Sequence, residues 1–336
     1  MTSPTSQAFT VRPLTPHEHP AVARILTETH PHDPMSVQDL ERLLEDQARW
    51  GYRHEALVAV RNPGTSNADR PVDDTVLGTA LYFQNPGAYH PHRYALHLAV
   101  GPQHQGQGIG AALWRELLAR LGALGAESAR IHAREDHPVA PGFLARRGGV
   151  PDHWAFPSTL DVPSFDPAPY AALFANLERQ GVRLTTLAAL RAQHTPHLNA
   201  RLCALMNEIR TDVPRPEPAL PLTQQLFDEA ILGDFGLLPD GYVVAEQGGT
   251  FIGQSTLFTN GEGEALFTGL TGVARPWRGR GLATAMKVRV IELARTLGAA
   301  QIVTDNASDN AAMLAVNERL GFARQPATAS YLVRFR

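Results

Sequence analysis

The chain has 336 residues, more than one ordinary hydrophobic core covers, which favours two domains. Its hydrophobic share of 43% and charged share of 19% are typical of a globular protein and argue against disorder. The formal charge of −3, from 30 basic and 33 acidic residues, argues against general nucleic-acid binding, which needs a basic field.

Other features of the chain concern its location. No apolar run approaches the length that crosses a bilayer, so we expect no membrane association. The amino end lacks the basic start and apolar stretch of a signal peptide. Cys203 is the sole cysteine, which excludes an intramolecular disulfide. Together these features predict a cytoplasmic protein.

Two parts of the chain repeat each other. The run QGQGIGAALWRELLARLGALGA at 105–126 aligns without gaps with RGRGLATAMKVRVIELARTLGA at 278–299. At the same offset, Gly108, Gly125 and Gly148 recur as Gly281, Gly298 and Gly321. Upstream, VLGTALYF at 76–83 resembles FIGQSTLF at 251–258. The repeat indicates two copies of one domain, which we place at 1–162 and 181–336 with a connecting helix over 163–180.

Each copy shows the same order of predicted elements. In the first copy these are strand 9–13, helices 16–29 and 36–49, strands 55–61, 75–84 and 93–100, a glycine turn with an amphipathic helix, strand 128–133, helix 139–147 and strand 154–161. In the second copy they are strand 182–186, helices 188–209 and 221–232, strands 241–247, 250–259 and 264–274, the turn and its helix, strand 300–304, helix 309–320 and strand 328–335. Strands that alternate with helices indicate an α/β class with a mixed sheet.

The glycine turn that opens the amphipathic helix predicts a phosphate site in both copies. Glycines let several backbone N–H groups converge on an anion, and the helix N-terminus adds partial positive charge. A Rossmann dinucleotide site is one alternative, but its turn follows the first strand of the domain. Here the turn follows several predicted strands, which disfavours that alternative. A turn that needs glycine for its geometry alone stays open.

The two turns resemble the phosphate loop of the GNAT acetyltransferase superfamily, Gln/Arg-x-x-Gly-x-Gly/Ala. The residues that fit are Gln105, Gly106, Gln107, Gly108, Ile109 and Gly110 in the first copy, and Arg278, Gly279, Arg280, Gly281, Leu282 and Ala283 in the second. Val273 before the second loop is also family-like. The resemblance covers nearly the whole chain twice, and mycothiol synthase has the same tandem organisation.

This resemblance implies two tandem GNAT domains, each a mixed, mostly antiparallel, splayed sheet flanked by helices. It also implies that acetyl-CoA is the co-substrate, with its pyrophosphate on the loop amides and its pantetheine arm between strands 264–274 and 300–304.

The resemblance further implies which residues of the second copy serve acetyl transfer. A backbone N–H near Thr271–Val273 would donate to the thioester oxygen. Asn306 and Asn310 would hold pantetheine or an active-site water. Asn317 stands where many family members have a tyrosine acid. An amide cannot protonate the leaving thiolate, although a thiol pKa near about 8.5 makes that acid dispensable. A structural amide bonded within its own helix is an equal alternative for Asn317.

The sequence leaves the general base open. The strand before the second loop carries no late glutamate, and Glu264 stands at its beginning. Glu208 and Asp212 lie by the proline-rich loop 210–221, which walls the acceptor pocket in the family. We expect Asp212 to act as the base through a water chain. An aspartate that caps a turn before proline is the competing interpretation.

The first copy departs further from the family pattern. Leu144 aligns with Asn317, and Gly149 replaces the usual phenylalanine. His97, on the strand before the loop, fits a base or a lone, partly buried histidine, and we favour the second. We therefore expect the first copy to bind CoA or to brace the second copy without turnover.

These inferences predict an N-acetyltransferase that moves acetyl from acetyl-CoA to the primary amine of a small molecule, by direct attack in the second copy. We expect no metal, because the histidine pairs at 17 and 19, 30 and 32, and 90 and 92 lack a third ligand at a strong spacing. A monomer or homodimer is expected. The alternative is a non-catalytic acyl-CoA sensor or a structural tandem module.

Overall fold

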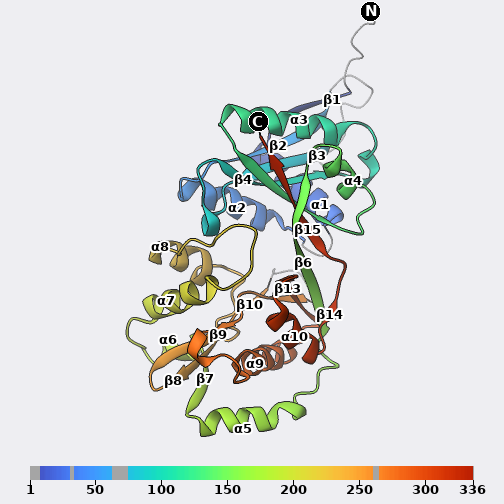
Figure 1. The fold of residues 1–336 in the computed structure, drawn as a ribbon. Helices are drawn as coiled ribbons and strands as arrows, with labels where there is room; N and C mark the ends of the chain where they lie inside the picture. The colour runs from blue at the N-terminus through green and yellow to red at the C-terminus, as the bar shows by residue number, and fades with distance from the viewer. Residues whose placement is uncertain (1–7, 31–33, 63–74, 260–264, 336) are drawn as a thin grey trace, which may run out of the picture. The chain divides into compact units, whose positions relative to one another are not determined.

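The computed structural model describes residues 8–30, 34–62, 75–259 and 265–335. The chain forms two compact units (Figure 1). The first comprises Met1–Ala133, Val139–Pro151 and Ser330–Arg336, and the second Arg134–Pro138 and Asp152–Ala329. Each unit has β-sheet flanked by helices, which confirms the predicted α/β class. Among the described residues, no helix is long and apolar enough to span a membrane.

The first unit is built on a mixed sheet. Its strands run in the order β1 (Phe9–Pro13), β2 (His54–Arg61), β3 (Val76–Phe83), β4 (Arg93–Val100) and β5 (Ser128–Arg134). The first four are antiparallel neighbours, and β4 and β5 are parallel. The helices are α1 (His19–Thr29), α2 (Val37–Arg49), α3 (Ile109–Ala123) and α4 (Ala140–Ala145). Helix α3 covers one face of the sheet and α1 the other (Figure 1).

The second unit holds two small sheets. One has the order β12 (Gly272–Val273), β9 (Thr250–Ser255), β8 (Val243–Gln247) and β7 (Val182–Thr186), all antiparallel. The other pairs β10 (Leu257–Thr259) with β11 (Ala265–Thr268), and β11 in parallel with β13 (Gln301–Ala307). The helices are α5 (Ala171–Arg179), α6 (Leu187–Ala192), α7 (Leu198–Arg210), α8 (Gln224–Phe227), α9 (Leu282–Thr296) and α10 (Ala311–Arg319).

The last strand of each copy belongs largely to the unit that contains the rest of the other copy. Residues Asp152–Asp161 of β6 (Val150–Asp161) belong to the second unit, where β6 pairs antiparallel with β13 and with the short β14 (Ala323–Arg324). Conversely, β15 (Thr328–Arg334) carries its residues from Ser330 onward in the first unit, where it lies next to β5 in the sheet. There the Arg130 guanidinium donates to Ser330 Oγ at 3.3 Å. The two copies are defined by the sequence repeat, whereas the two units are defined by how the chain packs. The units therefore do not test the copy limits at 162 and 181, which remain a prediction.

Three details of the predicted elements are wrong. Helix 188–209 is interrupted between α6 and α7, where His194 and His197 have positive φ and Pro196 disfavours helix at the residue before it. Strands 250–259 and 264–274 are each broken in two. The spacing of the apolar residues in the second amphipathic helix predicts one buried stripe that runs from Leu282 to Leu297. Leu282, Met286 and Val290 are buried, but Leu297 is exposed because it lies at the C-cap of α9.

Candidate active site

The two glycine loops share one backbone conformation. Gly106 and Gly279 both have φ of +75°, and Gly108 and Gly281 have φ of +82° and +84°. Gly108 is the N-cap of α3 and Gly281 the N-cap of α9. Side chains other than glycine rarely adopt this left-handed conformation. The glycines therefore fix the turn that leads each strand into its helix.

Side chains brace each loop from the same positions. Arg278 Nε donates to the Val273 carbonyl at 2.9 Å, and the aligned Gln105 Nε2 donates to Val100 at 3.3 Å. The third loop residues repeat the pattern: Arg280 bonds the Pro276 carbonyl at 3.5 Å, and Gln107 bonds Gln103 at 3.3 Å. The polar side chains thus bond back onto the loop, which orders its backbone amides at the helix N-terminus.

Below each loop the two central parallel strands separate. In the first copy β4 and β5 pair only from Arg93 with Ser128 to Leu96 with Ile131, although β4 continues to Val100. In the second copy β11 and β13 pair only from Ala265 with Gln301 to Phe267 with Val303. Each copy therefore has a gap in the ladder beside its glycine loop, as the resemblance implies for a pantetheine arm.

The second copy has a polar interruption that the first copy lacks. Between β11 and β12, residues 269–271 leave the ladder, and the partner strand breaks at Thr256. Gly269 N donates to the Thr256 carbonyl at 2.9 Å, and the Ser255 and Thr271 hydroxyls lie 2.8 Å apart. Gln254, Ser255 and Thr256 are all buried.

The aligned residues of the first copy are Thr79, Ala80 and Leu81 on the unbroken strand β3. The exchange of Ala-Leu for Ser-Thr in the aligned segments was the signal in the sequence.

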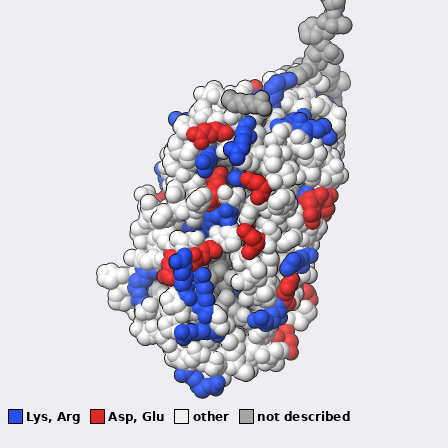
Figure 2. All heavy atoms as spheres, in the orientation of Figure 1, with Lys and Arg blue, Asp and Glu red and all other residues white. Residues whose placement is uncertain are grey.

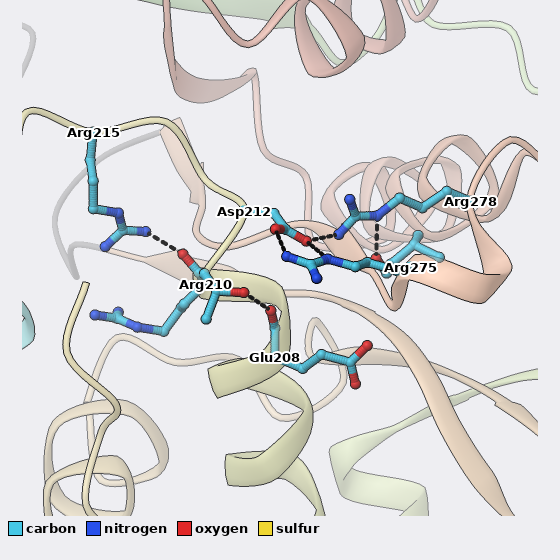
Figure 3. A network of polar contacts seen from close by, with 8 residues as sticks. Glu208, Arg210, Asp212, Arg215, Arg275 and Arg278 are labelled. Carbon is cyan, nitrogen blue, oxygen red and sulfur yellow. Dashed lines mark hydrogen bonds and ion pairs between the residues drawn. The ribbon is translucent and has the colours of Figure 1, made fainter. Parts of the chain in front are cut away.

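Asp212 lies in a network with two arginines at the glycine loop (Figure 3). Arg275 Nε bonds Asp212 Oδ2 at 2.8 Å, its Nη2 bonds Oδ1, and Arg278 Nη2 bonds Oδ2 at 2.6 Å. Helix α7 ends two residues earlier, and its Ile209 lies so close to Gly272 that a Cβ there would come within 2.1 Å of Ile209 Cγ2. Gly272 therefore permits the approach that brings Asp212 to the arginines.

This network changes the pKa of Asp212, the residue that the sequence predicts as the general base. The hydrogen bonds from Arg275, followed in size of effect by that from Arg278, hold the pKa of Asp212 well below its usual range. A carboxylate with such a low pKa takes up a proton poorly at neutral pH. Of the other carboxylates considered from the sequence, Glu208 lies one turn earlier on α7, and Glu264 lies outside the described residues.

The structure brings Asn306 and Asn317 together. Asn317 is 2% exposed, and its Nδ2 donates to Asn306 Oδ1 at 2.6 Å, while Asn306 Nδ2 donates to the Asp305 carbonyl at 2.5 Å. Asn317 Oδ1 is buried without a hydrogen-bond partner among the described atoms. Asn310 is the N-cap of α10, and its side chain accepts from Met313 N at 3.3 Å.

The acetyltransferase (GNAT) family matches residues 21–149 and 202–322. The chain belongs to the GNAT family. It is 26% identical over 320 residues to the mycothiol acetyltransferase of Amycolatopsis mediterranei (strain U-32), which covers 89% of this chain and 96% of that protein.

Two solved structures share the fold over nearly all of the chain. A GCN5-related N-acetyltransferase from Sphaerobacter thermophilus has a TM-score of 0.70 and 18% identity, over 98% of this chain and 96% of that one. A tandem GNAT protein from the clavulanic acid biosynthesis pathway has a TM-score of 0.69 and 20% identity, over 97% and 98% of the two chains. The expected tandem GNAT organisation is confirmed.

Two positions of the first GNAT copy differ in character from the second copy, since Leu144 aligns with Asn317 and His97 aligns with Leu270. Leu144, which aligns with Asn317, is 2% exposed. His97 stacks on Phe83, with ring centroids 5.5 Å apart. Burial, aided by His30 and His132, lowers the pKa of His97 to about 4, so this imidazole is neutral at pH 7.

Proposed function

We propose that this GNAT protein transfers acetyl from acetyl-CoA to the primary amine of a small molecule, and that the second copy carries the reaction. The observation that carries the proposal is the difference between aligned positions. Both copies have the same glycine loop, but only the second has the polar residues Ser255, Thr256 and Asn317 next to its separated strands. A glycine loop alone is suited to binding CoA, whereas a glycine loop with these polar groups nearby is also suited to acetyl transfer.

The residues present fit the phosphates of CoA. A Cβ added at Gly106, Gly108 or Gly279 would meet no atom within 4 Å, whereas one at Gly281 would lie 2.6 Å from Leu173 Cδ1. A ligand therefore has open space at both glycines of the first loop and at Gly279 of the second. In the second copy the amides of Gly279, Gly281, Leu282 and Ala283 would hold the pyrophosphate, with Arg278 and Arg280 as cations nearby. The aligned residues Gly106, Gly108, Ile109 and Gly110, with Gln105 and Gln107, would do the same in the first copy.

In the reaction we propose, the amine nitrogen attacks the thioester carbonyl directly. The C–N bond forms, the C–S bond breaks, and the thiolate leaves with the electron pair. Backbone N–H groups at Thr271–Val273 would donate to the oxygen on which charge develops. Asn306 and Asn310 would orient the pantetheine arm, and Asn317 would hold Asn306. Neither amide serves as an acid.

For Asp212 we propose a positioning role in place of the base. Its carboxylate joins the loop after α7 to the glycine loop through Arg275 and Arg278. That loop would then wall the acceptor pocket at a fixed distance from the thioester. The excess proton of the attacking amine would pass to water.

The acceptor class is supported by the relative named mycothiol acetyltransferase, whose name points to a small molecule. Figure 2 shows acidic and basic side chains interspersed over the visible face, with no extended basic field on that face. This supports a small acceptor over a nucleic acid. We further propose a cytoplasmic monomer or homodimer.

A matched pair of substitutions tests which copy works. Gly279→Ala and Gly106→Ala place a methyl at the same φ, with open space around both. Each should therefore cost the same strain, about 1–2 kcal/mol of unfolding free energy. We expect Gly279→Ala to lower kcat/KM for acetyl-CoA at least tenfold, and Gly106→Ala to change it less than threefold. The reverse pattern would assign catalysis to the first copy.

The alternative is that both copies bind acyl-CoA as a sensor and neither transfers acetyl. The absence of a tyrosine acid at Asn317 favours it. Turnover of acetyl-CoA with any member of a panel of small amines, lost in Gly279→Ala, would exclude the sensor. If acetyl-CoA gave no rise in Tm at saturation, both proposals would fail, because a ligand of the native state must stabilise it.

A further inference from the structure

Lys287 is the only lysine among the 30 basic residues of the chain. It lies on α9, six residues after the N-cap glycine of the proposed phosphate loop, and is 2% exposed. Its Nζ has no hydrogen-bond partner among the described atoms, and it lies 4.7 Å from the centroid of the Phe322 ring. Every other Lys or Arg position is arginine. Lys287, the one of these residues that is buried among those the structure describes, is therefore also the one that can lose its charge.

A second orphaned polar atom belongs to a residue that contacts the same phenylalanine. Phe322 N donates to the Asn317 carbonyl at 3.0 Å, and the side-chain oxygen of Asn317 is buried without a partner. A buried donor and a buried acceptor that each lack a partner both cost stability. One bond between Lys287 Nζ and Asn317 Oδ1, or one water that bridges them, would satisfy both.

The two copies of the chain show that these positions change together. Lys287, Asn306 and Asn317 align with Trp114, Ala133 and Leu144, which are all buried and all apolar. In the first copy the ring of Trp114 packs edge-on against Phe143, with centroids 5.9 Å apart. A lysine that served only packing would have no reason to change with the two amides. The second copy thus has three polar residues where the first has three buried apolar ones.

We propose that Lys287 is a positioning residue of the second copy, and that its Nζ orients the Asn317–Asn306 amide pair from the core side. The inference rests on the proposed function, in which Asn306 faces the pantetheine arm. Asn317 Nδ2 already bonds Asn306 Oδ1. A partner on Asn317 Oδ1 would fix the direction of the Asn317 amide, and thereby which atoms Asn306 presents at the separated strands. Burial, which lowers the pKa of Lys287 to about 7, allows this nitrogen to be neutral.

The single lysine permits a direct test that needs no acceptor. Protein labelled with ¹³Cε-lysine gives one lysine signal. We expect that signal to shift when Asn317 is replaced by leucine and again when CoA is added to the wild type. Gly279→Ala should abolish only the CoA response. A lysine signal that is unchanged by Asn317→Leu would overturn the inference, whichever copy proves to be catalytic.

A double-mutant cycle supplies the kinetic readout. Lys287→Met removes Nζ and keeps an unbranched side chain, and we expect it to lower kcat at least tenfold with little change in the CoA-induced rise in Tm. Because Lys287 acts through Asn317, the double variant with Asn317→Leu should lose no more than the worse single variant. Losses that multiply, or a Lys287→Met enzyme with wild-type kcat, would contradict the inference. Met286→Leu, at the next position on α9, is the control and should leave kcat unchanged.

Discussion

Arg278 Nη2 lies 2.6 Å from Asp212 Oδ2, which joins the first residue of the second glycine loop to a residue 66 positions earlier. The same guanidinium donates through Nε to the Val273 carbonyl. Arg278 therefore ties together the end of β12, its own loop and the segment after α7. A change at Asp212 should alter the geometry of all three.

Replacement of Asp212 by asparagine tests whether this residue positions or catalyses. The amide keeps the shape but loses both ion pairs, so we expect KM for the amine to rise several-fold and kcat to change less than tenfold. Steady-state kinetics with both substrates varied would show this. A loss of kcat above a hundredfold, together with loss of the acidic limb of the pH profile, would instead identify Asp212 as the base.

The same variant should change the acid stability of the protein. The pKa of Asp212 is lower in the folded chain than its ordinary 3.8, so its stabilisation is complete above pH 3.8 and is lost as the pH falls toward the folded value. Wild-type Tm should therefore fall more steeply than that of Asp212→Asn below about pH 4. Parallel curves in differential scanning calorimetry would show that the ion pairs do not stabilise the fold.

Gly272→Ala should displace the end of α7. The new methyl would meet Ile209 Cγ2 at 2.1 Å, and overpacking of this kind typically costs about 1–3 kcal/mol. Urea unfolding should show this loss. Ile209→Ala removes the clashing methyl, so the double variant should be more stable than the sum of the two single losses predicts. Additive losses would mean that the clash is relieved elsewhere.

Lys287→Met should change how stability varies with pH. The unfolded chain keeps the lysine proton up to about pH 10.5, whereas the folded chain releases it near pH 7. Wild-type stability should accordingly rise between those two values, by at most about 1.4 kcal/mol per pH unit. The methionine variant should lack this rise and be the more stable protein near pH 7. Urea titrations at pH 7 and 9 give the unfolding free energy of the wild type and of the methionine variant. If this free energy changed equally with pH in both proteins, a buried, ionisable lysine would be disproved.

Deletion of Ser330–Arg336 should affect the first unit although these residues end the second copy. They supply a strand of that unit, and Phe335 N also donates to the Glu127 carbonyl at 3.0 Å. We expect faster amide hydrogen exchange in β5 and a lower Tm. Ser330→Ala is the matched control, because it keeps the backbone and should alter exchange little. Faster exchange confined to residues 152–329 would contradict the assignment of this strand.

Local signals in the sequence were sufficient for the glycine loops and their helices. Positive φ at Gly279 and Gly281 is a property of the residue itself, and the buried stripe of α9 follows from its periodicity. The break before α7 also has a local signal in Pro196. These features depend on few neighbours, so one sequence carries them.

Features set by distant contacts could not be predicted in this way. The gap between β11 and β12 depends on the Thr256 carbonyl and on Ile209, from two other elements. Asp212 meets its arginines only because α7 reaches Gly272. Alternation within 154–161 and 328–335 shows that each forms a strand, but it does not say which sheet receives it. The positions of Asn306 and Asn317 in the sequence likewise do not reveal that they bond.

The placement of the last strand also has a consequence for the order of synthesis. Ribosomes build the chain from its amino end, and the first unit has its other strands by Ala133 but needs Ser330–Arg336 as well. At about 5–20 residues per second, the chain between Pro151 and Ser330 takes roughly ten to forty seconds to make. During that time the edge of β5 is open to pairing with other chains. The first unit therefore lacks one strand of its sheet for most of the time in which the second unit is being made.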